Sequence, residues 1–160
     1  LVFSPKGDLL YTANGGSPKN SPNENGVWSG GRNYTVYDLE KNRLAFDSYD
    51  KLEQSAALVG AYLDSQSEIR GIDPSDAAIG FVDNTPVLAI ATRQANGVFF
   101  LTLKDPANPF YLSLTASAGR GSAQVHYLPG REAFVSVDAI DGFLSIYTEV
   151  DVRRETGAGR

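Results

Sequence analysis

Short apolar runs separated by turn signals recur along the whole chain, and this feature constrains the fold more than any other. The turns at residues 6–8, 96–97, 129–130 and 141–142 each contain glycine and lie between runs rich in Val, Ile, Phe, Tyr and Thr. That pattern is the sequence signal of a β-hairpin. Eleven strands are predicted, over residues 1–4, 9–14, 34–38, 44–47, 79–82, 87–92, 98–103, 110–114, 125–128, 133–138 and 143–147. So many short strands place the chain in the all-β class.

The runs also repeat as a unit of four. "VFSP", "LLYTAN", "NYTVYDLEKN" and "RLAFDS" have the same order as "IGFVDN", "PVLAIATR", "GVFFLTLKDPANP" and "FYLSLTAS". A third copy supplies three strands, "VHYLPG", "EAFVSVDAID" and "GFLSIYTEV". Antiparallel four-stranded units of roughly 40 to 45 residues are typical of β-propeller blades. We predict a partial ring of about three blades, at 1–49, 77–116 and 122–150, followed by a polar tail at 151–160. A β-sandwich, which also has short strands and frequent turns, is the alternative.

Two insertions enlarge the first unit. Residues 15–33 are mostly Gly, Ser, Pro and Asn and predict a long exposed loop with Trp28 as its only large side chain. Residues 50–70 place Leu52, Ala56, Val59 and Leu63 at helical spacing. The spacing predicts one short amphipathic helix that lies on a blade.

Composition and charge exclude several classes of partner. The 160 residues include 42% hydrophobic residues, which is enough for the core of one domain. The formal net charge of -5 would repel a phosphate backbone, so no nucleic acid is expected. No apolar run approaches the ~20 residues of a membrane-spanning helix. The absence of Cys removes disulfides and zinc–thiolate sites.

Two complete units and most of a third do not close a ring, because propellers typically have four to eight blades. An open arc would leave two apolar blade faces and several strand edges in water. We therefore expect that the chain is the C-terminal part of a larger propeller. The expected partners are further blades, supplied by missing sequence or by other chains. A protein or glycan ligand is a further prediction.

The stretches "LVFSPKGDLLYTANGGSP", "YDLEKNRLAFDSYDKLEQ", "GVFFLTLKDPANPFYLS" and "GFLSIYTEV" together resemble the choice-of-anchor I domain. This is a propeller family of secreted and surface proteins, often labelled alkaline phosphatase-like. The resemblance runs from Leu1 to Val150. It implies an extracellular, cell-surface or periplasmic location.

The chain departs from the family where the family carries acidic groups around one mouth of the central channel. Gly15, Arg93 and Ala139 stand where the resemblance implies a glutamate after each second strand. The family's Pro-Glu-Gly turns are replaced at 75–77 and 122–124. We therefore expect any metal or phosphoester chemistry of the family to be weakened or lost.

The residues that remain near those positions are the candidate site residues. Asp73, Asp76 and Asp138 are the candidate metal ligands, because Ca²⁺ binds six to eight oxygen atoms. The residues leave Ca²⁺ open as a cofactor and indicate no other. If Arg93 and Gln124 face the channel mouth with Asp138, these three side chains would bind a ligand there. An anionic ligand would suit Arg93.

Two other positions have a conditional role. Asn33 opens an Asn-Tyr-Thr sequon and predicts glycosylation only if the chain is secreted by a eukaryote. His126 is the single histidine, lies in an alternating strand and is interpreted as structural. No residue is assigned a catalytic role.

Three functions remain open at this stage. The first is a non-catalytic extracellular or surface propeller that serves binding or assembly, and the loss of channel carboxylates favours it. The second is a metal-dependent phosphoesterase of the phosphatase-like kind, with the three aspartates as residual ligands. The third is a lactonase-like or other small-molecule propeller enzyme that shares only the phrase "SPKGDLLYTAN".

Overall fold

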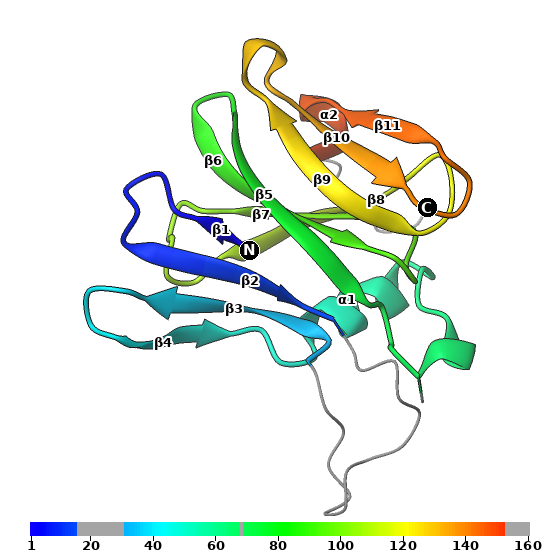
Figure 1. Cartoon of the computed structure of the whole chain (residues 1–160), viewed down its shortest axis with the longest axis horizontal. Helices are drawn as coiled ribbons and strands as arrows, with labels where there is room; N and C mark the ends of the chain where they lie inside the picture. Colours follow the sequence, from blue (N-terminus) through cyan, green and yellow to red (C-terminus); the bar gives the residue numbers. More distant parts are fainter. Residues whose placement is uncertain (16–30, 68, 153–160) are drawn as a thin grey trace, which may run out of the picture.

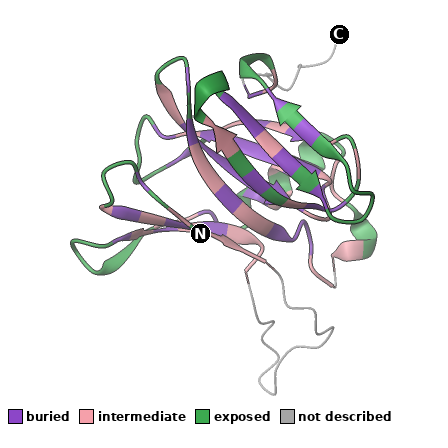
Figure 2. Ribbon diagram, turned by 45° about the horizontal axis from the view of Figure 1, so that its top comes forward, coloured by how far each residue is buried: buried purple, intermediate pink, exposed green. Residues whose placement is uncertain are grey.

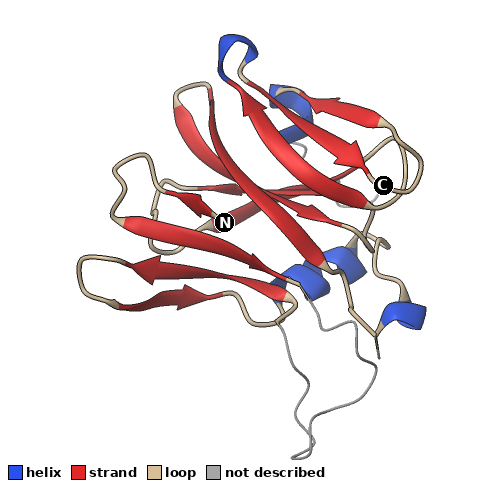
Figure 3. Cartoon of the chain, in the orientation of Figure 1, coloured by secondary structure: helices blue, strands red, loops and turns tan. Residues whose placement is uncertain are grey.

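The computed structural model describes residues 1–15, 31–67 and 69–152 and contains three antiparallel β-sheets (Figures 1 and 3). The N-terminal sheet has the order β1-β2-β3-β4, with β1 at Val2–Phe3, β2 at Leu9–Asn14, β3 at Asn33–Asp38 and β4 at Arg43–Asp47. The central sheet has the order β5-β6-β7-β8, with β5 at Pro74–Val82, β6 at Thr85–Thr92, β7 at Gly97–Thr102 and β8 at Phe110–Ala116. The C-terminal sheet has the order β11-β10-β9, with β9 at Ser122–Leu128, β10 at Ala133–Asp138 and β11 at Leu144–Tyr147.

The eleven predicted strands are confirmed in order, and so is their grouping as four, four and three. Strands that follow one another in the sequence are also neighbours in each sheet. Short turns join pairs such as β5–β6 and β6–β7, whereas the connection between β2 and β3 is the long segment 15–32. Two short helices, α1 at Lys51–Leu58 and α2 at Glu149–Val152, and two 3-10 turns, at Asp64–Gln66 and Pro129–Arg131, complete the described part of the chain.

The central sheet is covered on both faces, and this explains its sequence. The face that carries Leu88, Ile90 and Phe99 packs against the N-terminal sheet and α1. The opposite face, with Ala89 and Phe100, packs against the C-terminal sheet. Alternate residues of β6 and β7 are thus buried on opposite sides, so both strands are nearly continuous apolar runs. Figure 2 shows the buried residues concentrated in this middle layer.

Polar contacts connect the layers at their margins. The hydroxyl groups of Tyr11 and Tyr34 donate to the carbonyl oxygens of Pro106 and Pro109, at 2.9 and 3.2 Å, and so join the N-terminal sheet to the β7–β8 loop. On the other side, Ser113 of β8 donates to the carbonyl oxygen of Val152 in α2, at 2.8 Å. Buried hydroxyls that find backbone partners contribute about 1 kcal/mol each and fix the positions of the layers.

The first strands of the three sheets lie next to one another (Figure 1). Strand β5 contacts β1 and β2 on one side and β9 on the other. At Gly80 of β5 a Cβ atom would overlap the ring of Tyr127, so only glycine permits this approach. Ser75 and Asp76 add polar contacts to β9, through the carbonyl oxygen of Ser122 and the backbone N–H of Val125.

The helical insertion is shorter than predicted. Helix α1 ends at Leu58, and Gly60 follows with a left-handed φ of 72°. The N–H groups of Gly60 and Ala61 donate to the carbonyl oxygens of Ala57 and Ala56, which is the Schellman arrangement that ends helices. Leu63 therefore lies outside the helix, although its spacing continued the pattern.

The predicted loop and tail lie mainly outside the described residues. Residues 16–30, with Trp28, and residues 153–160 are not described. The first two residues of the predicted tail belong to α2, and Val152 is buried against the central sheet. Among the helices of the described ranges, none has the length and apolar character needed to cross a bilayer.

The packing between the central and C-terminal sheets generates a stability prediction. Phe100 is fully buried, with ring centroids 5.4 Å from both Phe134 and Tyr147. Truncation of Phe100 to alanine would leave a cavity, and we expect Phe100→Ala to lower the free energy of unfolding by about 3–5 kcal/mol in urea denaturation. Phe110→Ala is the matched control, because Phe110 is exposed and should change stability by less than about 0.5 kcal/mol. Equal effects of the two substitutions would contradict the assigned core.

Candidate functional site

The predicted site residues lie at one end of the three sheets, where β2, β6 and β10 finish. Gly15 follows β2, and a Cβ atom there would lie 3.0 Å from Asp73 Oδ1. Arg93 follows β6, and its backbone N–H donates to the carbonyl oxygen of Asp73 at 3.1 Å. The connections between the sheets also cross this end, which is where binding residues usually gather.

Asp73 is the buried centre of a small charge cluster. It has a left-handed φ of 51° and immediately precedes β5. Nitrogen atoms of Arg70 and Arg93 lie 3.3 and 3.4 Å from the same oxygen, Oδ2. Two guanidinium groups therefore share one carboxylate, and both distances exceed the 2.7–2.9 Å of a strong charge-assisted hydrogen bond.

A second ion pair lies beside the first. Arg32 Nη1 is 3.6 Å from Oε1 of Glu53 in α1, a distance too long for a hydrogen bond. Oε1 is buried and has no hydrogen-bond partner. Burial raises the pKa of the Glu53 carboxyl, and Arg32 and the backbone N–H of Ile72 offset only part of that increase. A Cβ atom at Gly71 would overlap the side chains of Glu53 and Arg32, so the backbone next to Arg70 lies directly against this ion pair.

The structure does not assemble the predicted ligand-binding set of Arg93, Gln124 and Asp138. No hydrogen bond or ion pair joins these three described side chains. Gln124 is exposed on β9, opposite Val137, on the face turned away from the central sheet. Asp138 is fully buried, and its two oxygens accept from the Ser122 hydroxyl at 2.7 Å and the Gly119 N–H at 2.9 Å. Its visible role is to hold the loop between β8 and β9.

The three candidate metal ligands also have separate partners. Asp73 faces the two arginines, Asp76 accepts from the N–H of Val125 at 3.1 Å, and Asp138 holds its loop. Within residues 1–15, 31–67 and 69–152, no three His, Asp or Glu side chains gather closely enough to hold a metal ion. The geometry therefore offers no support for a calcium site built from these aspartates.

Asn33 lies in a ladder of polar side chains on the N-terminal sheet. Its Nδ2 donates to Asp47 at 2.6 Å, and its Oδ1 accepts from Asn14 at 2.9 Å. A glycan would be attached through the same nitrogen that binds Asp47. Glycosylation of Asn33 stays a prediction.

Sequence reasoning missed Arg32, Arg70 and Glu53. Arg70 is the last residue of the insertion at 50–70, and Glu53 lies within the predicted helix without a motif that marks a site. The only local signal was the run Arg70-Gly71-Ile72-Asp73, in which a flexible glycine separates two opposite charges. That signal is weak, because Arg93 is 20 residues farther along the chain.

Comparison of the chain with protein-family models, with curated proteins and with solved structures found no match. The resemblance to the choice-of-anchor I domain, and the extracellular location that it implies, therefore stay predictions.

The environment of Glu53 predicts a pH-dependent change in stability. Because the folded-state pKa lies above the ordinary value of 4.5, the protonated carboxyl is favoured in the fold. This contribution is present below pH 4.5 and is lost as the pH rises through the raised pKa. We expect Glu53→Gln to stabilise the chain relative to the parent more at about pH 7 than at about pH 4, measured by urea denaturation. Glu40→Gln, at an exposed position, is the control and should show no such difference. An equal effect of Glu53→Gln at both pH values would contradict the prediction.

Proposed function

We propose that the chain is a section of a β-propeller that serves assembly or binding rather than catalysis. The observation that carries this proposal is that both outer faces of the three-layer stack carry exposed rows of apolar side chains. The stack is thus built to continue in both directions.

The outer face of the C-terminal sheet is the clearer of the two. Val135 pairs with Ile146 and Val137 with Leu144 across β10 and β11, all pointing away from the central sheet. Leu144 and Ile146 are 59% and 53% exposed. On β9 the same face carries the polar residues Gln124 and His126, so the apolar area lies over β10 and β11. A sheet with one face in water normally alternates apolar and polar residues, so exposed apolar pairs on the second face indicate that another layer covers this area.

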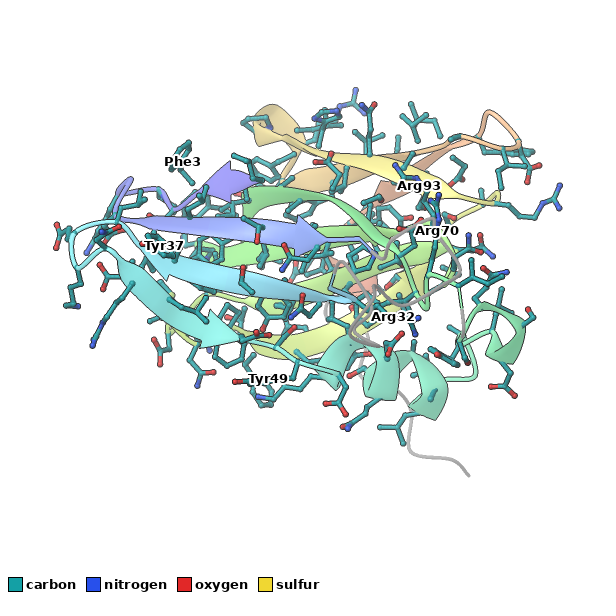
Figure 4. All side chains as sticks on the ribbon, turned by 60° about the horizontal axis from the view of Figure 1, so that its bottom comes forward. Phe3, Arg32, Tyr37, Tyr49, Arg70 and Arg93 are labelled. Atoms are coloured by element: carbon teal, nitrogen blue, oxygen red, sulfur yellow. The ribbon has the colours of Figure 1, made fainter. Side chains whose placement is uncertain are left out.

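The N-terminal sheet presents a similar face. Phe3, Leu10, Tyr37 and Leu44 are partners in register and form one row across all four strands. The opposite face of this sheet packs against the central sheet through the row Val2, Tyr11, Val36 and Phe46. Figure 4 marks Phe3 and Tyr37 at this sheet.

The two free faces are suited to each other by the internal repeat. The central sheet turns one face toward the N-terminal sheet and the opposite face toward the C-terminal sheet. In terms of the repeat, each contact therefore joins two non-equivalent faces. The free faces of the N-terminal and C-terminal sheets are non-equivalent in the same way. A further sheet of the same kind therefore fits either end, as in the radial repetition of a propeller.

The carboxylates give no support to the alternative of a hydrolase. Asp73, Asp76 and Asp138 are each bonded to arginine, backbone N–H or hydroxyl groups of this chain. Carboxylates with these partners have fewer free oxygen lone pairs for a metal ion or a reacting proton.

The assembly is tested with two exposed positions, one on each face. When no other sheets are present, the available occupant is a second copy of the chain, bound head to tail. We expect the native chain to self-associate, and Leu44→Lys or Ile146→Lys to weaken association by at least about tenfold in sedimentation velocity. A mixture of the two variants should recover a mixed dimer, because each supplies the intact face that the other lacks.

Leu58→Lys is the control, since Leu58 is exposed at the end of α1 and belongs to neither face. The assembly proposal fails if the chain stays monomeric and all three variants sediment like the parent. Calcium-dependent hydrolysis of p-nitrophenyl phosphate that disappears in Asp73→Asn would overturn the non-catalytic part.

A further inference from the structure

Three arginines at one end of the sheets carry an inference that is independent of assembly. Figure 4 labels Arg32, Arg70 and Arg93 and shows them at the same end of the molecule. They come from three different segments, namely the residue before β3, the turn before β5 and the turn after β6. Convergence of like charges costs free energy unless an anion compensates them.

The carboxylate inside the cluster compensates them only in part. Arg70 and Arg93 both contact the single oxygen Oδ2 of Asp73. Each guanidinium has five N–H donors, so most of these donors are not used by Asp73. Among the residues that the structure describes, Asp73 thus supplies one negative charge to the two positive charges of Arg70 and Arg93.

The carboxylate of Asp73 is more deeply buried than the guanidinium groups of Arg70 and Arg93. The Asp73 side chain is 2% exposed, whereas those of Arg70 and Arg93 are 33% and 41% exposed. An approaching solute therefore meets the guanidinium groups first. A buried carboxylate also holds both groups in place without closing them off from solvent.

The backbone fixes the two arginines relative to each other. The N–H of Arg93 donates to the carbonyl oxygen of Asp73, and the N–H of Gln94 donates to that of Ile72, both at 3.1 Å. Ile72 is buried in the core between the N-terminal and central sheets. The two segments that carry Arg70 and Arg93 are thus joined by main-chain hydrogen bonds, so little ordering is needed when a ligand binds.

We propose that Arg70 and Arg93, with Arg32 beside them, bind the oxyanion group of a ligand, a phosphate or a carboxylate. Neighbouring guanidinium groups present paired N–H donors that match the spacing of two oxygen atoms on such a group. The ligand oxygens would accept from the donors that Asp73 leaves free. The site concentrates positive charge on a chain whose net charge is -5, and it would attract small anions to this end.

The site is tested on the 160-residue chain by NMR titration with sodium phosphate and, separately, with sodium succinate, at ionic strength held constant with sodium chloride. We expect saturable shifts of the Arg70 and Arg93 Nε–Hε signals and of the amides of residues 70–73 and 93–94. Arg93→Gln should weaken binding by at least about tenfold, because a charge-assisted pair is lost. Saturation by both probes supports a general oxyanion site, and saturation by one assigns the ligand to that class.

Arg120→Gln is the matched control. Arg120 lies at the same end of the sheets but is exposed and already pairs with both oxygens of Asp141, at 3.1 and 3.0 Å. Equal weakening by Arg120→Gln would overturn the proposal, since a general potential would then explain the binding. Non-saturating shifts with both anions would overturn it as well.

Two further variants keep the test clear of folding and assembly. Arg93→Lys keeps the positive charge beside Asp73 but loses the planar fork, so a folded variant with weaker binding supports recognition by the guanidinium. Unchanged binding by Arg93→Lys and Arg93→Gln would overturn the assignment. Ile146→Lys, on the outer face of the C-terminal sheet, should bind the anions like the parent, which separates this site from the proposed assembly.

Discussion

Burial of both faces of the central sheet is the constraint on which the rest of the structure depends. Phe99 and Phe100 are consecutive, fully buried and directed to opposite sides, one toward Tyr111 and the N-terminal sheet, the other toward Phe134 and Tyr147. Removal of either outer sheet would expose the apolar residues on one face of the central sheet. Each Å² of apolar surface exposed by loss of a layer would cost about 25 cal/mol, and the free energy of unfolding of a domain is only about 5–15 kcal/mol.

The strands could be predicted because they depend on local sequence. Turns with glycine and apolar runs at period two mark their own positions, and all eleven were found. The start of β5 was missed because Ser75 and Asp76 are polar, yet this segment pairs with the end of β6 and also contacts β9. The end of α1 was missed because Leu63 continued the helical spacing beyond Gly60. Long-range pairing in the first case and one glycine in the second outweighed the apolar pattern.

The candidate site was predicted less well, for a physical reason. The repeat placed Arg93 and Asp73 at the same end of the sheets, and the structure does bring them together. Asp138 ends β10 at the same end of the sheets, one residue before the position equivalent to Arg93, yet it points inward to Ser122 and Gly119. The repeat predicts where the backbone lies, whereas the direction of a side chain depends on the partners nearby. Arg70 reaches the site because of the course of the chain between α1 and β5, and no periodic sequence pattern predicts that course.

The direction of stacking connects the two proposals. In a head-to-tail stack that continues the packing within this chain, every sheet would keep the shared orientation in which β2, β6 and β10 end on one side. The arginine end of each chain would then lie on the same side of the assembly, and the clusters would form a ring of positive charge. A face-to-face dimer would place the clusters at positions related by a two-fold axis. Stacking order therefore decides whether the charge of Arg70 and Arg93 acts singly or as an array.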